Sequence, residues 1–238
     1  MRIDGRKPDE MRPVSIERSY TKFAHGSVLI AVGNTKVICT ASIEDSVPPH
    51  KKNSGEGWIT AEYSLLPGST PRRVPRESSR GKVGGRTHEI QRLIGRSMRA
   101  IADLSAIGER TIWIDCDVIQ ADGGTRVAAI TGAYVALVDA ISSLKKNDQI
   151  TGEPLLGSVA AVSVGVVDSI PLLDLCYEED VTADVDMNIV LTGEGEYIEL
   201  QGTAEKQTFS EEELAQMMRQ AKKGISELTM IQKDALQN

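Results

Sequence analysis

Aromatic side chains are scarce in this chain, at 4% of its 238 residues: two tryptophans, two phenylalanines and five tyrosines. Proteins that hold single-stranded nucleic acid by stacking successive bases need several exposed rings along one surface. The scarcity therefore disfavours a nucleic-acid binder built on an aromatic platform.

Cysteine is also rare, and Cys39, Cys116 and Cys176 stand far apart without a C-x-x-C pair. No histidine lies at ligand spacing from them, so we expect no zinc site. An odd number of isolated cysteines, with no apolar leader in residues 1–6, favours reduced thiols and a cytoplasmic protein. No apolar run approaches the length of a membrane span, so we expect no membrane association.

Familiar catalytic motifs are missing as well. The chain contains no G-x-x-x-x-G-K-[ST] motif, which excludes a P-loop. His25, His50 and His88 occur in three different contexts, none with an acid at catalytic spacing, and we expect structural or solvent-exposed roles for them. No serine or cysteine is a convincing nucleophile, so any chemistry must come from other groups.

Charge is distributed unevenly, although the net charge of −7 alone argues against a nucleic-acid partner. Residues 72–99 hold nine basic side chains against two acids, whereas residues 174–213 hold thirteen acids and one lysine. Such asymmetry predicts a polyanion-binding site in an otherwise acidic body. Two solvated surfaces of opposite sign are the alternative. The basic residues of the first segment are Arg72, Arg73, Arg76, Arg80, Lys82, Arg86, Arg92, Arg96 and Arg99.

The hydrophobic pattern predicts an α+β protein of mixed sheets with packed helices, forming a single domain over residues 1–238. Gly33 and Asn34 separate two β-rich runs, which is a hairpin signal. We expect strands at 14–20, 26–32, 35–42, 58–66, 111–119, 157–167, 170–175, 183–191 and 196–202. Helical periodicity predicts helices over 88–104 and 127–144 and from Ser210 onward, with Arg92, Arg96 and Arg99 on one face of the first.

A long segment without helical or strand period, residues 67–86, contains three prolines and several arginines. Segments of this length are usually functional or disordered, and the arginines favour function. Arg72, Arg73 and Arg76 are among these arginines, and disorder of the isolated segment is the alternative.

Two glycine-flanked arginines precede predicted helices, in Gly84-Gly85-Arg86 and Gly124-Thr125-Arg126. Free backbone N–H groups and the helix dipole make such a terminus suitable for an anion, and an arginine adds a bidentate donor. A cation there opposes the dipole unless an anion completes the site. The two motifs therefore predict a phosphate site, with two ordinary surface turns as the alternative.

Asp184, Asp186 and Asn188 alternate with apolar residues, so a strand would place them on one polar face. If that face is solvated, it is an ordinary polar face. If it lines a cleft, a divalent cation or a raised pKa is required. Asp180 can join Asp186 only if the chain turns near residues 177–182, because an extended strand would separate them by ~20 Å.

Together these motifs resemble the ribonuclease PH family, from the first residue to the last predicted helix. Ribonuclease PH is similar in fold to polynucleotide phosphorylase core domains and exosome ring subunits, a ribosomal protein S5 domain 2-like fold. The segments that carry the resemblance are Met1 to Lys7, Gly85-Arg86, Arg92 to Arg96, Asp115 to Arg126 and Asp184 to Asn188.

The resemblance implies a phosphate-dependent 3′→5′ exoribonuclease, a tRNA nucleotidyltransferase that trims tRNA precursors and other RNA 3′ ends and releases nucleoside diphosphates. It implies that Arg86, Gly124, Thr125 and Arg126 hold inorganic phosphate. Asp180 and Asp186 would bind Mg²⁺ or supply a proton, with Asp184 close by. It also implies a role in rRNA processing and a homohexamer, a trimer of dimers. The residues that would contact RNA or a neighbouring subunit are Arg72, Arg73, Arg76, Arg92, Arg96 and Arg99. A non-catalytic RNA-binding ring subunit and a two-metal hydrolytic nuclease are the rival interpretations.

Overall fold

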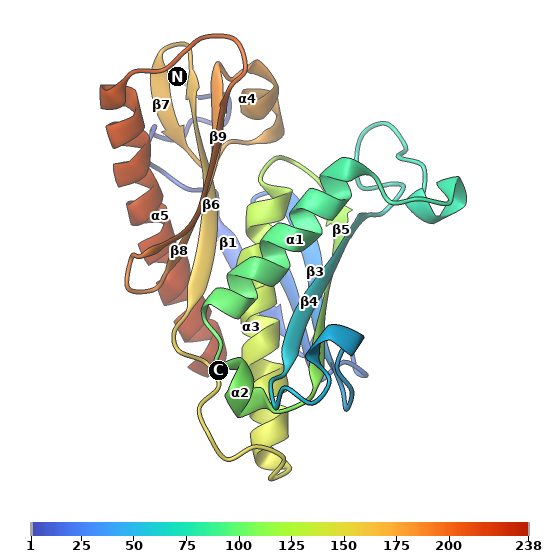
Figure 1. Cartoon of the computed structure of the whole chain (residues 1–238). Helices are drawn as coiled ribbons and strands as arrows, with labels where there is room; N and C mark the ends of the chain where they lie inside the picture. The colour runs from blue at the N-terminus through green and yellow to red at the C-terminus, as the bar shows by residue number, and fades with distance from the viewer. Residues whose placement is uncertain (1, 238) are drawn as a thin grey trace.

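The computed structural model describes residues 2–237, apart from the side chain of Arg80. Met1 and Asn238, the ends of the predicted domain 1–238, lie outside the described residues. Helices and strands are mixed as the α+β prediction requires (Figure 1). In chain order they are β1 (Val14–Arg18), β2 (Gly26–Val32), β3 (Thr35–Glu44), β4 (Trp58–Leu65), α1 (Gly85–Ala100), α2 (Leu104–Ile107), β5 (Thr111–Gln120), α3 (Thr125–Lys146), β6 (Val159–Val167), β7 (Ile170–Leu173), α4 (Tyr177–Thr182), β8 (Val185–Thr192), β9 (Tyr197–Ala204) and α5 (Glu211–Gln237), with short 3-10 helices at Pro49–Lys51 and Glu77–Arg80.

The first sheet has the order β1-β2-β3-β5-β4, antiparallel except for the parallel pair β4 and β5. Its β2–β3 connection is the hairpin predicted at Gly33 and Asn34, because Val32 pairs directly with Thr35. Gly33 has a φ of +55°, a left-handed conformation that glycine adopts without strain. The hairpin prediction is confirmed.

Helix α3 packs against this sheet and is buried on nearly all sides. A side chain at Gly26 of β2 would put its Cβ 1.9 Å from the Ala136 carbonyl oxygen, so glycine is needed for the close helix–sheet approach. Contrary to the expectation from the sequence, α3 has the length and hydropathy of a membrane span. It is a core helix instead, since its apolar side chains pack into the core shared by β2, β3 and β5.

The second sheet is antiparallel, with the order β7-β6-β8-β9. Its strands pack a cluster of apolar side chains against α5, which runs along one side of the sheet in Figure 1. The other side meets α3: the Ala161 N–H donates to the Thr131 hydroxyl, and the Gln232 amide donates to the Thr131 and Val159 carbonyls. The N-terminal ends of α1 and α3 thereby come close to α4 and β8. The prediction of a single domain stays a prediction.

Candidate active site

A cavity of about 910 Å³ lies where the first turns of α1 and α3 face α4 and β8. It brings together seven of the residues predicted from the sequence, drawn from segments up to 114 positions apart. These are Arg72, Arg86, Gly124, Thr125, Arg126, Asp180 and Asp186. One wall is therefore cationic and the opposite wall acidic.

The cationic wall is built at the start of α3. Gly123 and Gly124 have φ values of +78° and +65°, and the helix begins at Thr125. A Cβ at Gly123 would lie 2.6 Å from the Leu175 carbonyl oxygen, so only glycine lets the turn approach the segment that leads into α4. The backbone N–H groups of a first helical turn have no partner within the helix, and here Gly124, Thr125 and Arg126 of that turn line the cavity.

Arg86 and Arg126 each occupy the first turn of a helix, α1 and α3, rather than a free loop. Arg86 is exposed, whereas the Arg126 side chain is only 13% exposed. Arg126 donates to the Glu89 carboxylate at 3.1 Å and to the Gln201 side-chain oxygen at 2.7 Å. Sequence reasoning missed Glu89 and Gln201, because no local pattern marks a partner from another element.

Tyr63 is a further residue of this wall that the sequence did not indicate. Its hydroxyl lies 2.7 Å from the Thr125 hydroxyl, and the ring is only 3% exposed. Burial raises the pKa of Tyr63, against the hydrogen bond shared with Thr125 and the charges of Arg86 and Arg126. The neutral phenol therefore holds the Thr125 side chain in place at the head of α3.

The acidic wall joins two aspartates from different elements. The chain turns into helix α4 over Tyr177–Thr182, as the sequence required if Asp180 was to join Asp186. Burial raises the pKa of Asp186 to about 6, helped by the charge of Asp180 and opposed by Arg126. Burial also raises the pKa of Asp180, with Arg86 and Arg126 opposing. A raised pKa is one of the two alternatives that the sequence left open for carboxylates lining a cleft, and a bound divalent cation is the other.

Asp184 does not line this cavity. It precedes β8, and its backbone bonds to Val166, Glu205 and Lys206. Asn188 lines the cavity beside Asp186, while Val185, Met187 and Ile189 point to the core packed by α5. The predicted polar face therefore exists from Asp186 onward, and a role for Asp184 stays a prediction.

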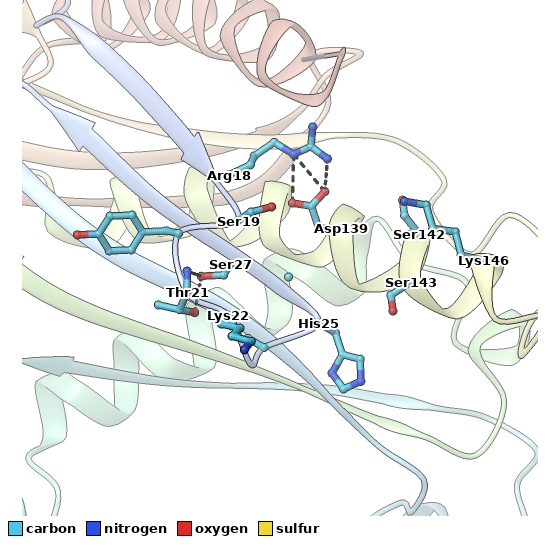
Figure 2. Close-up of a pocket in the computed structure, with 13 residues that line it drawn as sticks. Arg18, Ser19, Thr21, Lys22, His25, Ser27, Asp139, Ser142, Ser143 and Lys146 are labelled. Carbon is cyan, nitrogen blue, oxygen red and sulfur yellow. Dashed lines mark hydrogen bonds and ion pairs between the residues drawn. The ribbon is translucent and has the colours of Figure 1, made fainter.

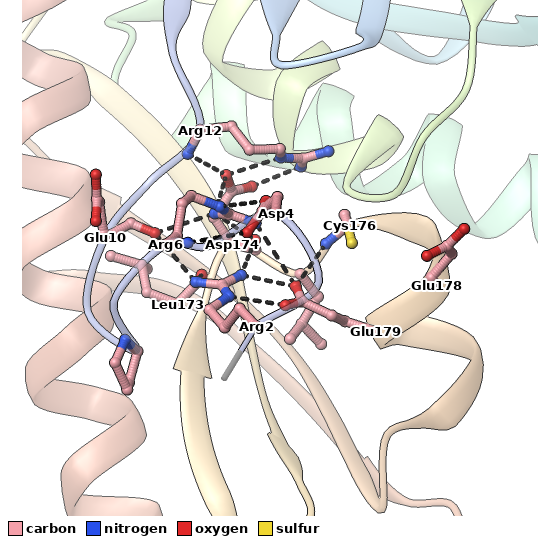
Figure 3. A network of polar contacts seen from close by, with 12 residues as sticks. Arg2, Asp4, Arg6, Glu10, Arg12, Leu173, Asp174, Cys176, Glu178 and Glu179 are labelled. Carbon is pink, nitrogen blue, oxygen red and sulfur yellow. Dashed lines mark hydrogen bonds and ion pairs between the residues drawn. The ribbon is translucent and has the colours of Figure 1, made fainter.

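A buried ionic network sets the distance between the two walls (Figure 3). Arg2 forms two hydrogen bonds of 2.7 Å with the carboxylate of Glu179, the residue before Asp180. Burial alone would raise the pKa of Glu179, but the hydrogen bonds from Arg2 and from the Cys176 N–H, with the charges of Arg2 and Arg6, together outweigh it and the pKa is lowered. The N-terminal segment thereby holds α4 in place.

Arg12 connects the N-terminal segment to the cationic wall. It donates to both carboxylate oxygens of Asp174, at 2.9 and 2.6 Å, and to the carbonyl of Asp122 just before the glycine turn. Arg12 is 5% exposed and Asp174 2% exposed. Through Arg12, the buried ion pair with Asp174 also reaches Asp122 and so connects the two walls. Sequence reasoning did not assign this role to Arg12.

The remaining arginines are not gathered in one place. Arg72 lines the cavity, and Arg73 and Arg76 are exposed on the segment between β4 and α1, which projects from the body in Figure 1. Burial raises the pKa of Asp117 on the first sheet and Arg76 opposes it, so the loop lies near that sheet.

The arginines of α1 point to different elements. Arg92 is exposed, and Arg96 pairs with Glu199 of β9 at 3.0 Å. Arg99 lies 4.5 Å from the ring centre of Trp58 and donates to the Ile59 carbonyl. Arg99 therefore anchors α1 on β4, and it still lies beside Arg96: burial lowers the pKa of Arg99 and the nearby charge of Arg96 lowers it further.

A second cavity, of about 620 Å³, lies at the other end of α3 (Figure 2). Its arginine, Arg18, is neutralised by Asp139 at 2.6 Å. Lys22, His25 and Lys146 also line it, but no aspartate faces an arginine across it as in the first cavity. Among the residues described, the first cavity is the one that combines the predicted groups.

Comparison with known proteins gives the family. The model of domain 1 of the 3′ exoribonuclease family matches residues 10–142, and the model of domain 2 matches residues 157–224. Ribonuclease PH of Corynebacterium kroppenstedtii is 61% identical over 236 residues, covering 99% of this chain and 93% of the relative. Ribonuclease PH of Corynebacterium efficiens is 61% identical over 235 residues, covering 99% and 96%.

Solved structures show the same fold at low sequence identity. Rice (Oryza sativa) Rrp46 superimposes with a TM-score of 0.80 and 22% identity, covering 99% of this chain and 100% of the other. The Archaeoglobus fulgidus exosome with RNA bound to the active site gives a TM-score of 0.79 and 21% identity, covering 95% and 91%. At these identities the likeness is evidence of fold alone.

Proposed function

The chain belongs to the ribonuclease PH family of 3′ exoribonucleases and is a phosphate-dependent exoribonuclease of tRNA processing, and we propose that the 910 Å³ cavity is where it acts. One observation carries this assignment. Two arginines at two helix N-termini face two carboxylates of raised pKa across a single cavity. The reaction joins two anions at one phosphorus, and this arrangement suits it.

Inorganic phosphate binds at the cationic wall, between the first turn of α3 and the guanidinium groups of Arg86 and Arg126. Thr125 donates its hydroxyl, held in direction by Tyr63. A phosphate oxygen then attacks the last phosphodiester, the bond from that phosphorus to the preceding 3′-oxygen breaks, and a nucleoside diphosphate leaves. Catalysis of this kind depends on holding two repelling anions in line and stabilising the equatorial charge, so no protein nucleophile is needed.

Asp180 and Asp186 act on the leaving group, which is the 3′-oxygen of the shortened RNA. With a pKa near 6, Asp186 exchanges protons readily near neutral pH and is suited to return a proton to that oxygen. The same two carboxylates also fit Mg²⁺, which binds proteins through one or two carboxylates and completes its shell with water and phosphate oxygens. Bound Mg²⁺ would neutralise charge on the phosphates.

The exposed arginines support contacts beyond the bound phosphate: Arg72 lines the cavity, and Arg73 and Arg76 lie on the same segment. Arg72, Arg73 and Arg76 would hold the RNA or a neighbouring subunit, with Arg92 as a further RNA contact. We propose a homohexamer, a trimer of dimers, acting in the cytoplasm on tRNA precursors, rRNA and other RNA 3′ ends. The three free cysteines are consistent with a reducing compartment.

Product identification tests the reaction. The protein is incubated with a short RNA and Mg²⁺, with and without inorganic phosphate, and the released nucleotides are separated. Nucleoside diphosphates formed only with phosphate are the expected result. Nucleoside monophosphates would indicate a hydrolytic nuclease, and an RNA that is bound but not shortened would indicate a non-catalytic ring subunit.

A further inference from the structure

Helix α4 presents more than a carboxylate to the cavity. Tyr177, Asp180 and Val181 are spaced i, i+3 and i+4, so they share one helix face, and all three line the cavity. Tyr177 is 52% exposed and Val181 58% exposed, both high for large apolar side chains. An aromatic ring and a valine thus flank the predicted catalytic aspartate with their surfaces uncovered.

The cavity is larger than one inorganic phosphate needs, because about 910 Å³ is in the range of cavities that hold whole small molecules. Its charged groups, among them Arg126 and Asp186, suit the phosphates. Tyr177, Val181 and Leu65 also line it and add apolar surface, which an anion does not use.

We propose that Tyr177 holds the base of the 3′-terminal nucleotide by stacking, with Val181 against the edge of that base. The proposal rests on the function assigned above and names the base subsite of that same cavity. An enzyme that removes whichever nucleotide comes next needs a contact that every base can make. The flat face of an aromatic ring provides it, since stacking tolerates all four bases.

One ring at the scissile nucleotide is consistent with the scarcity of aromatics. A platform for many successive bases needs many rings, whereas positioning a single base needs one. The base is joined to the reacting phosphorus through one ribose, so a stack beside Asp180 would also fix where that phosphorus lies. Tyr177 is thus a substrate-positioning residue.

The test compares Tyr177→Ala and Tyr177→Phe with the unchanged protein on a short RNA. Tyr177→Ala should raise the KM for RNA about 5- to 100-fold, the range expected for losing one base–ring stack, and leave the KM for phosphate unchanged. Tyr177→Phe keeps the ring and should restore the KM for RNA. Tyr20→Ala removes an exposed tyrosine at the second cavity and is the matched control, expected to have no effect.

A fluorescent base reports the stack directly. With 2-aminopurine as the 3′-terminal base, binding without phosphate should quench its fluorescence in the unchanged protein and in Tyr177→Phe, but not in Tyr177→Ala. An RNA whose terminal nucleotide lacks a base should bind the unchanged protein as poorly as normal RNA binds Tyr177→Ala, and the two losses should not add.

The outcomes separate this proposal from the function it rests on. Quenching that persists in Tyr177→Ala, or an unchanged KM for RNA, overturns the base subsite even if nucleoside diphosphates are formed. A Tyr177→Ala protein that elutes as a smaller assembly also overturns it, because Tyr177 would then contact a second copy. If quenching depends on Tyr177 but no product forms that requires phosphate, the base subsite is supported and the proposed phosphorolytic reaction is contradicted.

Discussion

Arg126 donates hydrogen bonds to both carboxylate oxygens of Glu89, at 3.1 and 3.3 Å. The arginine proposed to bind phosphate is therefore shared with an acid on the neighbouring helix, at the edge of the same cavity. Phosphate must compete with Glu89 for that guanidinium, and the competition sets how tightly phosphate binds.

Glu89→Gln should lower the KM for phosphate by about 2- to 5-fold, because a partly exposed ion pair contributes ~0.5–1 kcal/mol. Glutamine keeps an acceptor for Arg126 and for Gln201, so the position of the guanidinium is retained. The measurement is the initial rate of nucleoside diphosphate release against phosphate concentration. Glu199→Gln, which removes the acid paired with Arg96 outside the cavity, should leave this KM unchanged. Equal KM values for Glu89→Gln and the unchanged protein would contradict the competition.

Asp186→Asn should abolish phosphorolysis and leave RNA binding intact or slightly tighter, since the variant removes a negative charge from the RNA site. It should also stabilise the fold at pH 8. The pKa of Asp186 rises from 3.8 to about 6 in the folded chain. The protonated carboxyl therefore stabilises the fold fully below pH 4, and this contribution is lost as the pH rises through 6.

Urea unfolding with a chelator at several pH values measures this effect. At pH 8 Asp186→Asn should be more stable by up to about 3 kcal/mol, and the difference should disappear near pH 4. Asp184→Asn lies outside the cavity and should show no such difference. A constant difference at all pH values would mean that the carboxylate is as well solvated in the folded chain as in the unfolded one.

Local signals were enough to predict much of the fold. The Gly33–Asn34 hairpin depends on the turn preferences of two residues and on the runs beside them, and it was predicted where it occurs. Helix α1 was predicted from residue 88 but begins at Gly85. Glu77 explains the difference, because its carboxylate accepts hydrogen bonds from the Gly84 N–H and the Thr87 hydroxyl and so extends the helix start from a distant position.

The site was harder to predict, because its geometry depends on contacts between segments far apart in the chain. The six residues of α4 have no helical period of their own, so the position of Asp180 depends on Glu179 and its bond to Arg2. Arg99 has the spacing of an RNA-binding residue but stacks on Trp58, and no local pattern reveals that neighbour. Sequence motifs therefore indicated which side chains could take part in binding or catalysis, and the tertiary contacts determine which of them lie close together.

Asp174→Asn should lower the free energy of unfolding by about 3–5 kcal/mol, because it leaves the buried Arg12 guanidinium without its counter-charge. Asp174 has a φ of +56°, a conformation that asparagine also accepts, so the backbone is not the cause of the loss. Asp168→Asn is the matched control: that residue has a φ of +50° but is exposed, and its replacement should change stability little. Urea unfolding at pH 7 compares the two variants.

Arg86→Ala or Arg126→Ala should each reduce phosphorolysis about 10²- to 10³-fold, as expected for the loss of one preorganised donor to the reacting phosphate. Lys146→Ala, in the second cavity, removes a cation that has no part in the reaction and should leave the rate unchanged. Rates at saturating phosphate and RNA, with circular dichroism to verify folding, give the comparison. Near-normal turnover in either arginine variant would show that the phosphate lies elsewhere.

The arginine loop connects assembly with RNA binding. Arg72, Arg73 and Arg76 are exposed on a segment that projects from the body, and such a basic segment is stabilised when it packs on an acidic neighbour. Residues 174–213 of a second copy supply exposed acids for that purpose, among them Glu178, Glu194, Glu196, Glu205, Glu211 and Glu212. RNA threading through a ring would then meet several copies of the loop.

Replacing Arg72, Arg73 and Arg76 by alanine together should weaken tRNA binding, and the protein should elute smaller than a hexamer. Each phosphate contact with a single strand contributes a salt slope of about −0.7, so loss of three contacts should flatten the slope by about 2. Replacing the exposed Lys22, Lys36 and Lys146 removes as much charge elsewhere and should flatten it much less. Very short RNAs should suffer less from the arginine changes, because of the three arginines Arg72 alone lines the cavity, and Arg73 and Arg76 do not. A hexamer that binds tRNA with an unchanged salt slope would show that the loop is neither an interface nor an RNA contact.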